Sequence, residues 1–192
     1  VIIGGGIHGA GVAQAAGAAG YSALVIEKTA LAHGTSSKSS KLIHGGLRYL
    51  ETAQIKLVFE CLSERTLLLK LAPDLVRLEP FYIPIYKHTK RRPWEIRAGL
   101  TLYAILGKLK KDARFEKISK EKWDQLDGLK TDGLQAVFKY KDGATDDAAL
   151  TRAVMASAKS LGAELAMPAE FISATVHTDH NIVEYSINGT LH

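Results

Sequence analysis

Apolar runs and one small-residue stretch alternate along the first 26 residues. Residues 1–3 and 22–26 are almost continuous apolar runs, which is typical of strands buried on both faces of a parallel sheet. The alanine-rich stretch 10–19 lies between them, and Gly20 follows it as a helix stop. This pattern predicts a strand–helix–strand unit at the start of the chain.

The remaining pattern predicts three helices and several short strands. Apolar residues recur at helical spacing in three stretches, at residues 52–72, 94–106 and 150–161. Short apolar runs predict strands at residues 81–86, 163–167, 170–176 and 182–187. Pro84 places the first of these strands at a sheet edge or bulge, and Asn188-Gly189 predicts a hairpin turn into a return strand. Residues 112–135 are charged and turn-rich, so we expect a small excursion between elements there.

The turn after the first apolar run satisfies the pattern G-x-G-x-x-G with Gly4, Gly6 and Gly9. Glycines at these positions permit a tight turn, the close approach of a pyrophosphate, and close packing of a helix on a strand. Glu27 lies at the tip of the second run, where a carboxylate accepts hydrogen bonds from the hydroxyls of an adenosine ribose. The pattern therefore predicts a dinucleotide site. The acidic side chain of Glu27 argues against a ligand with a 2′-phosphate, which disfavours NADP as the cofactor. FAD and NAD remain possible.

Composition indicates one globular domain and part of another. The chain has 192 residues, of which 46% are hydrophobic and 23% charged, with a mean hydropathy of -0.01. Cys61 is the single cysteine, which excludes an intrachain disulfide and a CxxC site, and we predict no metal site. The uncharged apolar stretch 98–107 is far shorter than the ~20 residues of a spanning helix, so we expect neither a transmembrane segment nor a signal peptide. Because the sequence opens inside an apolar strand and ends inside a hairpin, we interpret it as a piece of a longer protein.

A hydroxyl-rich run, 32–41, and a glycine-containing segment, 42–50, follow the acid. By composition alone the first run indicates a solvated loop. The pair Gly45-Gly46 in the second suits a backbone that must lie close to a flat ring system. Together, residues 34–37 and 39–51 closely resemble the signature of FAD-dependent glycerol-3-phosphate dehydrogenases, which belong to the D-amino-acid-oxidase-like flavoproteins.

The resemblance implies an α/β fold, in which an FAD-binding Rossmann-like βαβ domain is joined to part of an interleaved antiparallel-sheet substrate domain. It implies three parts: an FAD-binding and flavin-contacting part, part of a substrate or cap domain, and a return to the FAD-binding domain, at residues 1–80, 81–145 and 146–192. FAD is the implied cofactor. The residues implied to bind it are Gly4, Gly6, Ile7, His8, Gly9, Glu27, Lys28, Thr35, Ser36, Ser40, Lys41, Leu42, His44 and Gly45.

Arg48 and Tyr49 are implied to bind the substrate, by meeting the phosphate of glycerol 3-phosphate. A guanidinium binds phosphate bidentately, and a phenol adds one neutral donor. The alternative for Arg48 is a surface ion pair with Glu51 or Glu60. For His44, the alternative to flavin contact is a structural role.

The implied reaction is the oxidation of glycerol 3-phosphate to dihydroxyacetone phosphate. A base removes the proton of the C2 hydroxyl while a hydride passes from C2 to flavin N5. We identify no catalytic base, because the family places it beyond these residues. The alternatives are a glycerol-3-phosphate oxidase that uses oxygen, an amino acid or amine oxidoreductase of the same fold, and a non-enzymatic nucleotide-binding domain.

Positive charge is concentrated in the middle of the chain. Residues 38–111 hold 15 basic and 6 acidic side chains, in a chain whose net charge is +5. Basic residues flank the predicted helix 94–106 on both sides: Lys87, Lys90, Arg91 and Arg92 before it, and Lys108, Lys110 and Lys111 after it. This arrangement suits an anionic membrane surface, and a solvated rim around a core helix explains it equally well.

The resemblance favours the membrane, because dehydrogenases of this kind pass electrons to membrane quinone. It implies a cytoplasmic protein that is peripheral at the cytoplasmic membrane. We do not expect a nucleic acid partner, because the sequence shows no aromatic-interleaved platform and no recognition motif.

Overall fold

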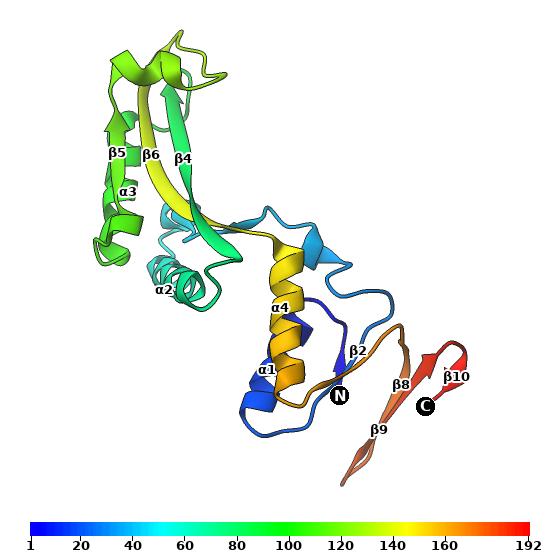
Figure 1. The fold of residues 1–192 in the computed structure, drawn as a ribbon. Coiled ribbons are helices and arrows are strands. Elements are labelled where there is room, and N and C mark those ends of the chain that lie inside the picture. Colours follow the sequence, from blue (N-terminus) through cyan, green and yellow to red (C-terminus); the bar gives the residue numbers. More distant parts are fainter. The chain divides into compact units, whose positions relative to one another are not determined.

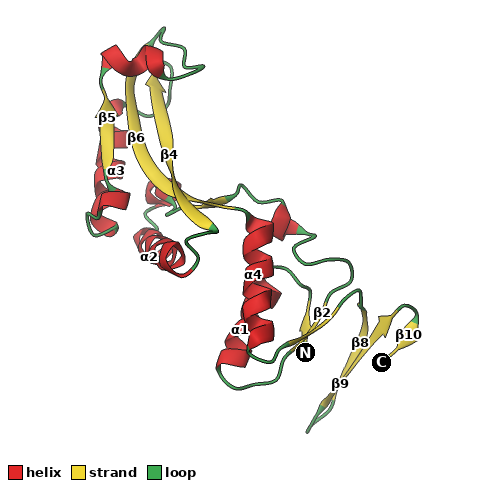
Figure 2. Ribbon diagram, in the orientation of Figure 1, coloured by secondary structure: helices red, strands yellow, loops and turns green.

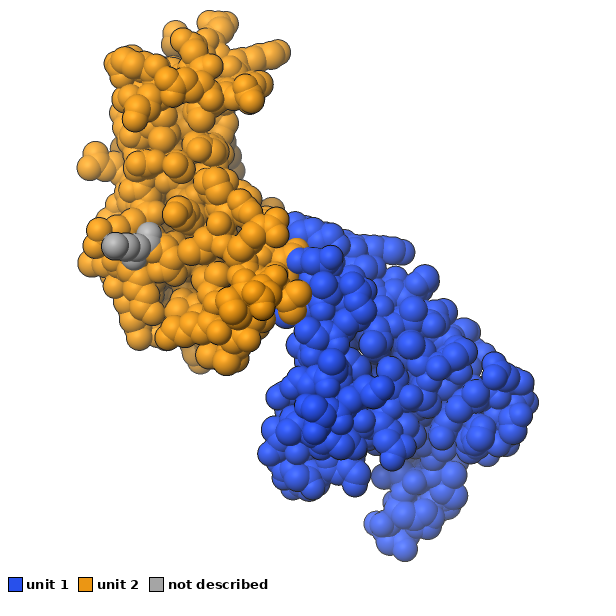
Figure 3. All heavy atoms as spheres, viewed as in Figure 1, with its two compact units in different colours: residues 1–41, 146–192 blue, residues 42–145 orange. Residues whose placement is uncertain are grey.

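The chain divides into two compact units. A computed structural model describes the backbone of residues 1–192 and every side chain except that of Lys111. Unit 1 comprises residues 1–41 and 146–192, and unit 2 comprises residues 42–145 (Figure 3). The second unit is thus an insertion in the sequence of the first.

Unit 1 contains the predicted strand–helix–strand unit. Its parallel sheet has the order β1-β2-β7, with strands at Ile2–Ile3, Leu24–Ile26 and Glu164–Ala166. The helices α1 (Ile7–Ala18) and α4 (Asp147–Ser160) lie side by side (Figure 1). Their small residues meet β2 in one buried cluster that includes Ala10, Ala13, Val25, Met155 and Ala158. The Rossmann-like βαβ prediction is confirmed.

A second sheet in unit 1 is antiparallel and follows the order β10-β9-β8, with strands at Thr190–Leu191, Asn181–Ile187 and Glu170–Val176. Asn188 and Gly189 between the last two strands both have positive φ, at 52° and 84°. Two successive left-handed residues form the turn that suits the twist of a two-residue hairpin. The predicted hairpin and return strand are confirmed.

Unit 2 is built on an antiparallel sheet around one long strand. The strand β6 (Leu134–Thr145) pairs with β4 (Val76–Tyr86) on one side, and with β3 (Leu42–Ile43) and β5 (Phe115–Ile118) on the other (Figure 2). The helices α2 (Ile55–Leu71) and α3 (Pro93–Leu106) belong to the same unit. Four short 3-10 helices complete the chain: η1 (Thr35–Ser37), η2 (Leu47–Thr52), η3 (Lys111–Ala113) and η4 (Lys120–Gln125).

Two strands of unit 2 differ from the predicted pattern. The strand β4 begins at Val76 rather than at residue 81, and β6 was not predicted. Residues 112–135, expected as an excursion, contain β5 and η4. Charged residues interrupt the apolar pattern of these strands, because one face of the antiparallel sheet is accessible to water. Pro84 lies on β4, which pairs with β6 alone, so its predicted edge position is confirmed.

Two helices begin earlier in the sequence than predicted. The helix α1 begins at Ile7 rather than at residue 10, and α4 begins at Asp147 rather than at residue 150. The Asp146 carboxylate accepts a hydrogen bond from the amide of Ala149 and caps α4, so polar capping residues extend a helix beyond its apolar pattern. None of the helices in the described part of the chain combines the length and the apolar composition needed to cross a bilayer. The predicted division by function at residues 80/81 and 145/146 concerns ligand contacts and stays a prediction.

Candidate functional site

The glycine turn joins β1 to α1 in a conformation that requires glycine. Gly4 has a φ of +98°, and its amide donates to the carbonyl of Ile26 on the neighbouring strand at 2.8 Å. A residue with a Cβ is strained at this φ. Gly6 lies at the start of α1, and Ile7 and His8 form its first turn together with Gly9.

Gly9 packs directly against the turn. A Cβ at this position would lie 2.0 Å from the Gly4 carbonyl oxygen and 3.4 Å from the side chain of Ile2. The obstacle is backbone, so it cannot rotate away. The third glycine of the pattern therefore lets the helix approach the strand, as the sequence predicts.

The N-terminus of α1 has the features of an anion site. No acidic residue lies in its first turn, and Gly6 provides no side-chain cap. The amide of Ile7 donates to Ser36 Oγ at 2.9 Å, which brings η1 to the helix terminus. Helix N-terminal amides and the helix dipole together favour a bound phosphate. Ser36 thus lies at the turn, whereas Thr35 is exposed on the same 3-10 helix, and the contacts of both with the cofactor stay predictions.

Glu27 is half-buried beside this turn. Its carboxylate accepts hydrogen bonds from the amide of Gly5 at 2.6 Å and from the amide and hydroxyl of Thr29 at 2.8 and 3.1 Å. Burial raises the pKa of this group, but the hydrogen bonds from Thr29 and Gly5 lower it more, and the net pKa lies below the ordinary value. Glu27 is therefore an ionised acceptor at neutral pH, as binding to ribose hydroxyls requires.

Lys41, a predicted cofactor residue, forms an ion pair with Asp147 at the start of α4. The same carboxylate accepts from the hydroxyl and the amide of Ser39 at 2.7 and 3.1 Å. Hydrogen bonds from Lys41 and then Ser39 hold the pKa of Asp147 well below its ordinary range. Nothing in the sequence indicated that Asp147 anchors the end of the hydroxyl-rich run.

The remaining predicted residues of unit 1 are solvent-exposed. Lys28 pairs with Glu170 on β8 at 2.5 Å, with more than half of each side chain exposed. Ser40 lies between the two bonded residues of the run and is also exposed. Their predicted contacts with the cofactor stay predictions.

In unit 2, a sharp turn follows β3, whose first residue is Leu42. His44 is exposed, whereas Gly45 and Gly46 are buried. Gly46 has a φ of +73° and begins η2, which carries Arg48 and Tyr49. The rings of His44 and Tyr49 are 6.3 Å apart between centroids.

Arg48 lines a cavity of about 460 Å³ within unit 2, together with Leu47, Leu50, Glu51, Arg91, Glu95, Ile96, Gly99 and Tyr140. Its guanidinium is exposed and forms no ion pair with any side chain that the structure describes. Glu51 pairs with Arg91 at 3.4 Å, and Glu60 lies 3.9 Å from Lys56. The alternative of a surface ion pair for Arg48 is therefore wrong. Tyr49 is not among the residues that line the cavity.

A buried polar cluster beneath Gly45 was not recognised in the sequence. It consists of Arg65, Tyr103 and Asp142, from three different elements of unit 2. A charged residue on an amphipathic helix is ordinarily solvated, so the sequence carries no signal that Arg65 is buried.

The residues of unit 1 fit the diphosphate and ribose of FAD. The turn leaves no room for a Cβ at Gly9, and a Cβ at Gly6 would lie 3.1 Å from Ser36 Oγ. The first turn of α1 carries no negative charge, and Glu27 supplies an ionised acceptor at the strand tip. Among the described residues, no group of three or more His, Cys, Asp or Glu side chains is placed to hold a metal ion.

Comparison with known proteins gives a consistent result. The model of the FAD dependent oxidoreductase family, DAO, matches residues 1–187. The glycerol-3-phosphate dehydrogenase of Pseudomonas tolaasii is 43% identical over 173 residues, which are 90% of this chain and 33% of that protein. The chain thus spans about a third of the length of this curated relative.

Solved structures share the fold. The glycerol-3-phosphate dehydrogenase from Bacillus halodurans complexed with FAD aligns with a TM-score of 0.71 and 25% identity, covering 100% of this chain and 31% of that chain. L-proline dehydrogenase from P. horikoshii aligns with a TM-score of 0.70 and 18% identity, covering 99% of this chain and 51% of that chain. The second likeness concerns the fold alone.

Proposed function

Because the chain belongs to the FAD dependent oxidoreductase family, we propose that the full-length protein oxidises sn-glycerol 3-phosphate to dihydroxyacetone phosphate. Its similarity to glycerol-3-phosphate dehydrogenases, at 43% identity over most of the chain, supports this substrate. FAD, when bound, accepts the hydride from C2 of the substrate. The residues of this chain would bind and orient the two molecules, and we assign none of them as the catalytic base.

Unit 1 would hold the adenosine and diphosphate half of FAD. The amides at the start of α1 would face the phosphates, and the ionised Glu27 would accept hydrogen bonds from the ribose hydroxyls. Asp147 holds Ser39 and Lys41, which fixes the end of the hydroxyl-rich run that would line the ribityl chain. His44 and Gly45 of unit 2 would contact the isoalloxazine ring.

The observation that carries the substrate proposal is the free guanidinium of Arg48. It lines a cavity and has no carboxylate partner among the described side chains, so its charge is available to a ligand. A phosphate satisfies a guanidinium through two parallel charge-assisted hydrogen bonds. Tyr49 would add a donor from the same 3-10 helix.

Kinetics of Arg48 variants in the full-length protein test this assignment. We expect Arg48→Ala to raise KM for glycerol 3-phosphate by about 10- to 150-fold, since a hydrogen bond to a charged group contributes about 1.5–3 kcal/mol. Arg48→Lys should recover part of the loss, because it restores the charge without the planar fork. Lys56→Ala, which removes a positive charge from an exposed part of α2, is the matched control. An unchanged KM in Arg48→Ala contradicts the assignment.

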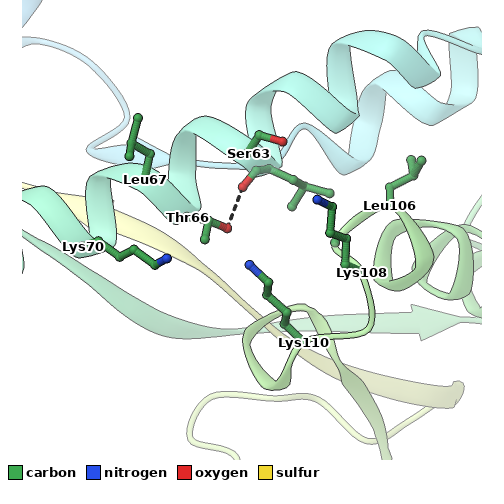
Figure 4. A pocket seen from close by; sticks show the side chains of 9 residues that line it. Ser63, Thr66, Leu67, Lys70, Leu106, Lys108 and Lys110 are labelled. Carbon is green, nitrogen blue, oxygen red and sulfur yellow. Dashed lines mark hydrogen bonds between the residues drawn. The ribbon is translucent and has the colours of Figure 1, made fainter.

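We further propose that electrons pass to a membrane quinone and that unit 2 contacts the membrane. The groove between α2 and α3 supports this (Figure 4). Lys70, Lys108 and Lys110 line a pocket of about 240 Å³ there, and Figure 4 shows Lys70 and Lys110 extending into it. Large apolar side chains are exposed on the same two helices and the loop after α3: Phe59, Leu67, Leu71, Trp94, Ile105 and Leu109. Ammonium groups beside exposed apolar side chains match the anionic headgroups and acyl boundary of a bilayer.

Co-sedimentation with vesicles tests the membrane proposal. Each lysine near an anionic surface contributes about 1 kcal/mol, so the double variant Lys108→Ala/Lys110→Ala should bind phosphatidylserine vesicles about 30-fold more weakly. Lys159→Ala on α4, an exposed lysine of unit 1, is the control. Equal binding by both variants, or equal binding to purely zwitterionic vesicles, contradicts it. Hydrogen peroxide formed in step with turnover would identify oxygen rather than quinone as the acceptor.

A further inference from the structure

Three polar side chains of unit 2 are almost completely buried, and two of them contact the carboxylate of the third, Asp142. Arg65 of α2 and Tyr103 of α3 are each 1% exposed, and Asp142 of β6 is 2% exposed. Arg65 Nη1 lies 2.8 Å from Asp142 Oδ1, and the Tyr103 hydroxyl donates to Asp142 Oδ2 at 3.0 Å. The other terminal nitrogen of Arg65, Nη2, lies 3.3 Å from Asp112 Oδ2.

The carboxylate also holds the backbone of the glycine pair that follows His44. The amide of Gly45 donates to both oxygens of Asp142, at 3.1 and 3.3 Å. The amide of Gly143 donates to Oδ1 at 3.1 Å. Asp142 therefore accepts from four groups, one on each of four segments of unit 2.

Gly45 is pressed against this cluster. A Cβ on Gly45 would lie 2.2 Å from the Tyr103 hydroxyl and 2.4 Å from Leu62. The chain then turns at Gly46 and enters η2, which carries Arg48 and Tyr49. The position of the cluster thus fixes where that short helix begins.

Stability alone is a weak explanation for these buried charges. Removing an ion pair from water costs several kcal/mol per ion, and apolar replacements of similar volume are often as stable. What apolar residues cannot supply is an acceptor for the Gly45 amide at a fixed point. The burial of Tyr103 and the negative charge of Asp142 raise the pKa of its phenol, which keeps the hydroxyl as a donor.

We propose that Asp142, held by Arg65 and Tyr103, is a positioning residue that fixes the His44–Gly45 backbone and, through it, aims Arg48 at the substrate. It acts through other residues and touches neither flavin nor substrate. This inference rests on the proposed function, because it takes His44 and Gly45 as the flavin-contacting segment.

The variant Asp142→Asn in the full-length protein tests the proposal. The asparagine side chain keeps the shape of aspartate but has an amino group in place of one acceptor oxygen. One of the four groups that donate to Asp142 would then face another donor. At saturating FAD, well below the melting temperature, we expect KM for glycerol 3-phosphate to rise about tenfold or more. We also expect weaker FAD binding and displaced visible absorption bands of the bound flavin.

The control is Val137→Ala, a buried substitution on the same strand five residues away. It should lower the melting temperature but leave KM and the flavin spectrum as in the wild type. If Asp142→Asn behaves like Val137→Ala, the cluster is structural only and the proposal is overturned.

If Asp142→Asn does not fold, Tyr103→Phe provides a second test of the same cluster. It removes one donor from the carboxylate and leaves the ring in place, and we expect smaller changes in the same readouts. Wild-type KM and spectrum in Tyr103→Phe, with Asp142→Asn unfolded, would overturn the proposal.

Failure of the proposed function can be distinguished from failure of this positioning proposal. If glycerol 3-phosphate does not reduce the wild-type flavin, the substrate assignment fails. FAD affinity and the flavin spectrum of the variants still measure positioning, since neither requires turnover. A wild-type protein that binds no FAD overturns both.

Discussion

Replacing Gly9 with alanine tests how closely α1 packs against the glycine turn. The added Cβ would lie 2.0 Å from the carbonyl oxygen of Gly4, whereas ordinary contacts of a Cβ begin at 3.4 Å. The helix or the turn must therefore move by more than an ångström, because no side-chain rotation relieves a backbone clash. That movement would displace the amides at the start of α1, which we propose to bind the phosphates of FAD.

The magnitude follows from the size of the overlap. Overpacking of this kind costs about 1–3 kcal/mol, so the free energy of unfolding should fall by that amount. Gly11 lies two residues along the same helix, and a Cβ there would meet nothing within 4 Å. Gly11→Ala should instead stabilise the protein by about 0.4–1 kcal/mol, because alanine reduces the entropy of the unfolded chain.

Urea denaturation and FAD titration of the two full-length variants provide the measurement. We expect Gly9→Ala to lower the urea midpoint and to weaken FAD binding, while Gly11→Ala leaves FAD affinity unchanged. The two substitutions lie on the same helix but should change the free energy of unfolding in opposite directions. If Gly9→Ala is as stable as Gly11→Ala and binds FAD equally well, the close approach of α1 to the turn is wrong.

Further predictions concern the two carboxylates of unit 1. Glu27→Gln should weaken FAD binding at neutral pH, measured by flavin fluorescence, and wild-type affinity here would remove Glu27 from the ribose site. Because the pKa of Glu27 is lowered in the folded protein, its stabilising contribution is present above the ordinary glutamate pKa and is lost as the pH falls through the lower folded value. Asp147→Asn should lower the urea midpoint at pH 7 by releasing Ser39 and Lys41. Since the pKa of Asp147 is depressed, the difference between wild type and variant should stay constant above about pH 5 and shrink only in strong acid. A difference that disappears between pH 7 and 5 would contradict this assignment.

Local patterns in the sequence predicted the parts of the fold that local physics determines. The apolar runs at the start, the glycine turn and Glu27 all lie where a strand–helix–strand unit requires them. Asn188-Gly189 specified its turn because two left-handed residues favour few other conformations. The FAD-binding fold of the family followed from this unit and from the signature after it.

Long-range pairing was not predictable in the same way. The strand β6 has Lys139 and Lys141 among its residues, and its place at the centre of a sheet depends on partners up to about 100 residues away. Asp142 and Arg65 look like ordinary surface residues in the sequence, yet they pair at 2.8 Å in the interior. Only the tertiary structure brings their elements together, so composition and periodicity could not identify the cluster.

The visible spectrum of the purified full-length protein tests the central claim most directly. Under anaerobic conditions without an electron acceptor, the protein should show the absorption of a bound flavin, and this absorption should bleach when glycerol 3-phosphate is added. L-Proline should leave it unchanged. A protein that stays colourless after incubation with FAD, or a flavin that is reduced by an amino acid and not by glycerol 3-phosphate, would contradict the account.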